Sequence, residues 1–198
     1  GVYRLGLDGT TLSTANTYAI VRSGKYTLPL VYGSSFVKSH VQPQVYTGFK
    51  DYQGKAITAP WVIVGNTPVV GGKTQYKAKV IWSNPEGAVK FDANQAKNFT
   101  NGKAGEPAWL NFTIDKTKVK CGNAVIAVTD AQNRVMWSWQ LWFTHEGATA
   151  SVPVKGKAQN AKTYKYMAEP LGWVYTKLQY LKGAKDNTRR VKVYVKQT

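Results

Sequence analysis

Apolar and polar residues alternate along much of the chain, and the alternation is clearest over residues 134–143. In an extended chain one face would carry, from the N-terminal side, Val135, Trp137, Trp139, Leu141 and Phe143, and the other Met136, Ser138, Gln140 and Trp142. The first face is wholly apolar and the second is mixed, which is typical of a strand with one side on a core. We therefore predict that Trp137 and Trp139 are buried and that Gln140 is exposed.

Turn signals divide the rest of the chain into short extended runs. Residues 16–33 form two such runs around Ser23 and Gly24, which predicts a hairpin, and a second hairpin is predicted over 76–91. A third is predicted over 118–144, with turn chemistry from Asp130 and Asn133. No segment has a convincing helical pattern. The spacing predicts an all-β fold, an antiparallel β-sandwich of the immunoglobulin-like or jelly-roll-like Greek-key kind.

The end of the chain carries one more alternating segment. Valines at 191, 193 and 195 point one way, and lysine and tyrosine point the other. We expect residues 190–196 to pair within their own domain and the isolated chain to be a monomer. In a polymerising subunit such a strand could instead be donated to a neighbour. The simplest organisation is one sandwich domain over residues 1–198, which could be a piece of a longer exported protein.

Composition supports the β interpretation. Of 198 residues, 43% are hydrophobic and 13% aromatic, and runs of strong helix formers are few. The one cysteine, Cys121, cannot form an intramolecular disulfide. No apolar run approaches the roughly 18 to 20 residues needed to span a bilayer, and the first residues lack a signal-peptide profile.

The charge balance leaves two interpretations open. Lys and Arg number 27 against 10 Asp and Glu, a formal net charge of +17. The lysines are spread along the strands, as expected for solvated faces and protected sheet edges. The same charge would attract acidic polysaccharide, lipid headgroups or nucleic acid. The lysines form no defined stripe, and the sequence motifs of known nucleic-acid-binding domains are missing. We therefore expect no specific nucleic-acid partner.

Candidate catalytic groups are sparse. The two histidines are His40 and His145, and His145 and Glu146 would point to opposite faces of an extended strand. The chain lacks enough His and Cys residues for a zinc site, and it has no phosphate-binding loop or nucleophile elbow. We therefore expect a protein that is not an enzyme and has no catalytic residues, metal or cofactor.

Three segments resemble a known family. The stretch "GNAVIAVTDAQNRVMWSWQLWFT" (122–144) is similar to a segment of the fimbrillin-like, adhesin-type proteins of gut Bacteroidetes. "TANTYAIVRSGKYTLPLVYG" (14–33) resembles their "ANCY-x-V" strand and the segment after it, and "YKYMAEPLGWVY" with "RRVKVYVKQ" resembles their closing part. The chain departs from the pattern at Thr17, where the family usually has Cys, and at Gln140, where it usually has His.

The resemblance implies an exported protein, often a lipoprotein held at the outer membrane by an N-terminal lipid anchor that this chain does not contain. The leading hypothesis is a non-enzymatic cell-surface or periplasmic protein in adhesion or fimbrial assembly, with surface glycans or other fimbrial subunits as partners. The alternative is a carbohydrate-binding module for glycans, acidic ones included. Its best ligand-contacting candidates are Trp142, Trp173 and Tyr175.

Overall fold

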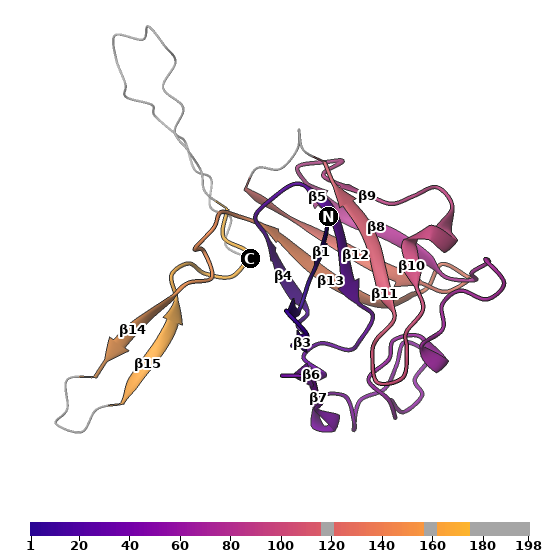
Figure 1. Cartoon of the computed structure of the whole chain (residues 1–198), viewed down its shortest axis with the longest axis horizontal. Helices are drawn as coiled ribbons and strands as arrows, with labels where there is room; N and C mark the ends of the chain where they lie inside the picture. The colour runs from indigo at the N-terminus through magenta and orange to yellow at the C-terminus, as the bar shows by residue number, and fades with distance from the viewer. Residues whose placement is uncertain (116–120, 157–161, 175–198) are drawn as a thin grey trace, which may run out of the picture.

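The computed structural model describes residues 1–115, 121–156 and 162–174. Within these ranges the regular structure consists of β-strands and three short 3-10 helices, with no α-helix (Figure 1). The predicted all-β class is confirmed. The predicted strand at 190–196 and the candidate Tyr175 lie outside the described residues.

The larger of the two main sheets has five strands. They are β1 (Val2–Arg4), β5 (Gly24–Pro29), β9 (Val89–Lys90), β10 (Phe99–Thr100) and β11 (Trp109–Ile114). Strand β11 lies in the middle and pairs antiparallel with β5, β9 and β10. Strand β1 pairs with β5 in parallel.

The second main sheet has four strands in the order β4-β13-β12-β8. Their bounds are β4 (Thr17–Ile20), β8 (Lys77–Asn84), β12 (Gly122–Thr129) and β13 (Val135–Phe143). Strand β12 pairs antiparallel with both neighbours, whereas β13 and β4 are parallel. These two sheets are therefore mostly antiparallel, with the parallel pairs β1–β5 and β13–β4. The prediction of purely antiparallel sheets was wrong in this respect.

The connections correct two of the three predicted hairpins. Strands β4 and β5 are consecutive in the chain but belong to different sheets, and so do β8 and β9. A turn signal at Ser23 and Gly24 shows that an extended run ends there, but the next run finds its partner far away in the sequence. The hairpin of β12 and β13 is confirmed.

Buried residues of the two main sheets form one hydrophobic cluster. Its members include Tyr26, Leu28, Leu110, Phe112 and Ile114 from the five-stranded sheet, and Tyr18, Ile20, Ile126, Trp139, Leu141 and Phe143 from the four-stranded sheet. This shared core holds the two sheets together, because burying apolar area is the main favourable term in folding.

The burial of Trp137 differs from the prediction. Trp139 is only 1% exposed, as predicted, but Trp137 is half-buried and packs against Tyr32 with ring centroids 5.0 Å apart. The pairing register shifts here, with Val128 opposite Trp137 and Thr129 opposite Val135. Met136 is thus the extra residue of a β-bulge, and it takes a buried place in the core.

The described residues also form three small two-stranded sheets. Their strands are β2 (Leu7–Asp8), β3 (Thr11–Leu12), β6 (Phe36–Val37), β7 (His40–Val41), β14 (Ser151–Lys155) and β15 (Thr163–Met167). The β14–β15 hairpin stands away from the two main sheets (Figure 1), and every residue of its two strands is exposed.

Candidate functional site

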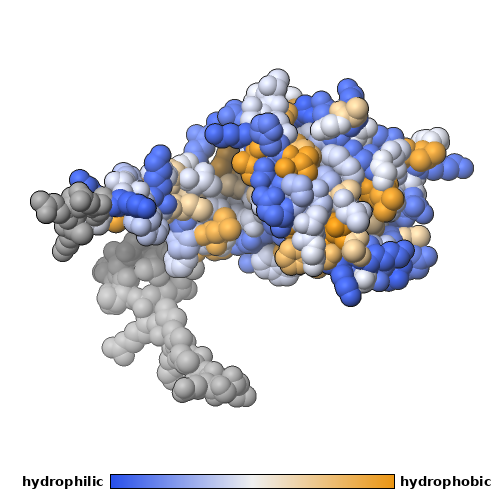
Figure 2. Space-filling model, turned by 90° about the horizontal axis from the view of Figure 1, so that it is seen from below, coloured by the Kyte–Doolittle hydropathy of each residue, from blue (hydrophilic) through white to orange (hydrophobic). Residues whose placement is uncertain are grey.

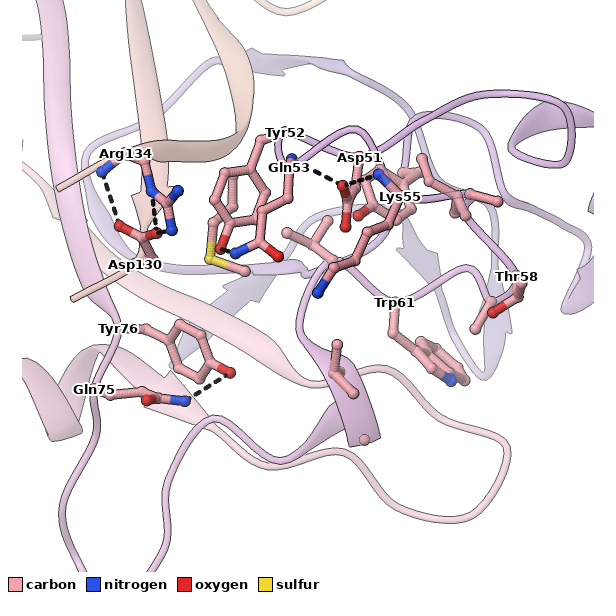
Figure 3. Close-up of a pocket in the computed structure, with 18 of the residues that line it drawn as sticks. Asp51, Tyr52, Gln53, Lys55, Thr58, Trp61, Gln75, Tyr76, Asp130 and Arg134 are labelled. Carbon is pink, nitrogen blue, oxygen red and sulfur yellow. Dashed lines mark hydrogen bonds and ion pairs between the residues drawn. The ribbon is translucent and has the colours of Figure 1, made fainter. Parts of the chain in front are cut away.

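A pocket of about 410 Å³ lies at one end of the four-stranded sheet. Its walls come from the loop over residues 51–65, from residues 75 and 76 just before β8, and from the turn over residues 130–136 that joins β12 to β13 (Figure 3). Since β8, β12 and β13 are neighbouring strands, these ends meet on the same side of the molecule.

Asp130 organises the turn between β12 and β13. Its Oδ1 accepts hydrogen bonds from the backbone N–H groups of Gln132 (3.0 Å) and Arg134 (2.9 Å), and its Oδ2 accepts one from the Arg134 Nε (2.8 Å). Burial raises the pKa of Asp130, but the hydrogen bonds and charge of Arg134 outweigh it and lower the pKa below its ordinary value. Asp130 is therefore an ionised carboxylate that fixes the Arg134 guanidinium.

Tyr52 stands beside this ion pair. The Arg134 guanidinium carbon lies 5.4 Å from the centroid of the Tyr52 ring, and Gln53 Nε2 donates to the Tyr52 hydroxyl (3.0 Å). Burial and, next, the Asp130 carboxylate raise the pKa of Tyr52. The ring is thus held in place with its hydroxyl protonated at neutral pH.

Two further aromatic side chains line the pocket. Tyr76 and Trp61 are half-buried, so each ring is partly accessible. The Tyr76 hydroxyl accepts a hydrogen bond from Gln75 Nε2 (3.2 Å). Figure 3 shows Tyr76 with Gln75 beside it on one side of the pocket and Trp61 on the opposite side.

A tight turn over residues 51–55 supplies the last wall. Asp51 Oδ1 accepts hydrogen bonds from the backbone N–H groups of Gln53 (2.8 Å) and Lys55 (2.9 Å), and Gly54 has a φ of 80° that favours glycine. From this turn the Lys55 side chain extends toward the centre of the pocket (Figure 3).

The residues predicted to contact a ligand lie elsewhere. Trp142 is 0% exposed, and its indole N–H donates to the backbone carbonyl of Trp173 (2.8 Å). The Trp142 ring is therefore covered by the segment that contains Trp173 and is not presented at the surface. Trp173 itself is 51% exposed, and neither tryptophan lines the pocket.

Gln140 is half-buried, not exposed as predicted. Thr17 Oγ1 donates to Gln140 Oε1 (3.1 Å), and Gln140 Nε2 donates to Asn123 Oδ1 (2.9 Å). Asn123 Nδ2 in turn donates to the carbonyl of Gly172 (2.9 Å). The two positions at which the chain departs from the fimbrillin-like pattern are therefore direct partners.

Sequence reasoning missed the pocket because its loop carries no periodic pattern. The usable signal was chemical: Trp61, Tyr76 and the Asp-Tyr-Gln run at 51–53 are aromatic and amide side chains next to turns. Asp130 was recognised only as a turn residue.

No protein-family model, curated protein or solved structure matches the chain. The resemblance to fimbrillin-like proteins therefore rests on the sequence motifs alone. No helix in the described ranges has the length and apolar character needed to cross a membrane. In those same ranges no three or more His, Cys, Asp or Glu side chains gather to hold a metal ion.

Proposed function

We propose that this chain is a non-enzymatic, exported cell-surface or periplasmic protein that acts in adhesion by binding carbohydrate in the pocket formed by residues 51–65, 75–76 and 130–136. In this proposal the two main sheets form a sandwich of the Greek-key kind, and the pocket lies among the connections at one end. The sequence motifs support the adhesion assignment, and the pocket supports the choice of ligand.

The observation that carries the proposal is the combination of rings and planar polar groups in one hollow. Trp61 and Tyr76 are half-buried aromatic residues of the pocket lining, the Gln75 amide lies beside Tyr76, and the Gln53 amide lies beside Tyr52. A sugar ring has apolar C–H faces that pack on aromatic rings, and hydroxyls at its edge that exchange hydrogen bonds with amides and charged groups. The pocket offers both kinds of contact.

The test is a binding screen of the whole chain against neutral and acidic glycans, followed by titration of any glycan that binds. Tyr76→Ala and Trp61→Ala should each weaken binding about tenfold or more, because each removes an aromatic contact surface. Trp82→Ala is the matched control, since Trp82 is 50% exposed on β8 and does not line the pocket. Equal binding by the three variants and the unchanged chain would contradict the site.

Fimbrial assembly is the second candidate function, and the β14–β15 hairpin favours it. Val152 pairs with Tyr166 and Val154 with Tyr164, so large exposed side chains share one face of the hairpin. Exposed apolar surface of this kind is typical of protein contacts. We expect the isolated chain to sediment as a monomer, and stable self-association that Tyr166→Lys abolishes would favour assembly over glycan binding.

A further inference from the structure

The charged side chains of the pocket differ in the ion pairs and hydrogen bonds that they already make within the protein. Asp130 and Arg134 bind each other, and Asp51 Oδ1 accepts two backbone N–H groups. Lys55 is different: within the described part of the chain its ammonium has no ion-pair or hydrogen-bond partner. It is thus the charge that a ligand can reach without breaking an existing contact.

The position of Lys55 is built into the turn. The backbone N–H of Lys55 is one of the two groups bound by the Asp51 carboxylate, so the Cα of Lys55 is anchored and its side chain leaves the turn toward the pocket (Figure 3). Trp61 and Tyr76 line the same hollow. A sugar ring packed on Tyr76 would lie between that ring and the Lys55 ammonium, with the groups at its edge facing the ammonium.

We propose that the ligand is an acidic sugar of the uronic acid class, whose ring packs against Tyr76 and whose carboxylate binds the Lys55 ammonium. This inference rests on the proposed carbohydrate-binding function. A charge-assisted hydrogen bond is shorter and about twice as strong as a neutral one. A carboxylate therefore gains more from Lys55 than the hydroxymethyl group of a neutral sugar does.

The net charge of the molecule acts in the same direction. With a formal charge of +17, the protein attracts anions over longer range and raises their concentration near its surface. This general attraction cannot distinguish one lysine from another, however. A single substitution in the pocket separates the specific contact from the general field.

The experiment uses methyl glycosides of glucose, galactose and mannose, each matched with its uronic acid, titrated into the whole chain and followed by NMR. The expected result is that at least one uronide binds about tenfold more tightly than its neutral partner, the effect of one hydrogen bond to a charged group. Lys55→Met should abolish this preference with little change in neutral-sugar affinity. Lys55→Arg should retain it.

Lys73→Met is the control for net charge, because Lys73 is exposed and does not line the pocket. A preference that survives Lys55→Met, or is lost equally in Lys73→Met, would overturn the inference, and so would equal binding of every matched pair. If each uronic acid binds as tightly as its neutral partner and Tyr76→Ala abolishes binding of both, the proposed function stands without the acidic specificity. Absence of binding by every sugar in both series would overturn the two together.

Discussion

Single residues of β13 contribute unequally to stability although they follow one alternating pattern. Trp139 is fully enclosed in the core, whereas Trp137 keeps part of its ring exposed and donates its indole N–H to Asn16 Oδ1 (2.8 Å). We predict that Trp139→Ala lowers the free energy of unfolding by about 3 to 5 kcal/mol and that Trp137→Ala costs less. Urea denaturation of both variants checks this, and an equal or larger loss for Trp137 would contradict the packing.

Gln140 is the second residue whose role changes with the structure. Its side chain accepts from Thr17 and donates to Asn123, and truncation leaves both groups without this partner in a half-buried place. We predict that Gln140→Ala lowers the free energy of unfolding by about 1 to 2 kcal/mol. The double variant with Thr17→Val should cost less than the sum of the two single changes, because one shared contact is lost only once. Strict additivity would show that the contact contributes nothing.

Elements were predictable from the sequence where local chemistry decides them. The β12–β13 hairpin follows from alternation and from a turn in which Asp130 binds backbone N–H groups and Asn133 adopts a φ of 61°. The pairing of β4 with β13 was not predictable, because 120 or more residues separate the partners and turn residues do not encode the partner of the strand that follows.

The candidate site shows the same limit. Alternation correctly placed Trp142 on the face opposite to Trp139, since Trp139 belongs to the core cluster and Trp142 does not. The alternation could not predict that another segment covers this second face. In that segment the backbone carbonyls of Gly172 and Trp173 accept hydrogen bonds from the four-stranded sheet. Burial of an outward-facing ring depends on contacts that only the folded chain brings together.

A contact between His145 and Glu169 joins the end of β13 to the segment after β15. His145 Nδ1 lies 2.7 Å from the backbone carbonyl oxygen of Glu146, and Nε2 lies 2.6 Å from Glu169 Oε1. The Glu146 carbonyl, and next Glu169, raise the pKa of His145 above its ordinary value of 6.5. Because the folded pKa is raised, the stabilisation is fully present below the unfolded pKa and is lost as pH rises through the folded pKa.

We therefore predict that the His145 ring titrates above 6.5 in the folded protein, as followed by its ring C–H signals in NMR. Glu169→Gln should move the midpoint down, while the Glu146 carbonyl still favours the protonated ring. At a pH below both midpoints, the amide of Ala168, which donates to the carbonyl of Ala150 (2.8 Å), should exchange faster in Glu169→Gln than in the unchanged chain. An unchanged midpoint in this variant would show that Glu169 does not hold the ring.

At the scale of the whole molecule, the positive charges of the described residues are spread over several elements. On the face seen in Figure 2, hydrophilic residues are scattered among apolar ones and do not gather into one band. Lysines occur on both main sheets and on their connections, for example Lys79 on β8 and Lys103 between β10 and β11. Dispersed charge of this kind favours solubility and weak, general attraction to polyanions.

This dispersion predicts how the protein behaves on a heparin-like resin. Exposed charges are screened beyond about 8 Å at physiological ionic strength, so retention by a diffuse field should end below about 0.15 M salt. Lys79→Gln and Lys103→Gln should each lower the eluting salt concentration slightly and by similar amounts, because no single position dominates. Binding of one acidic sugar in the pocket should depend far less on salt, since it neutralises one charge where a polyanion engages many. Two results would instead indicate a specific polyanion-binding surface: retention well above physiological salt, or a large effect of only one of the two lysine substitutions. The +17 charge would then be part of the recognition itself.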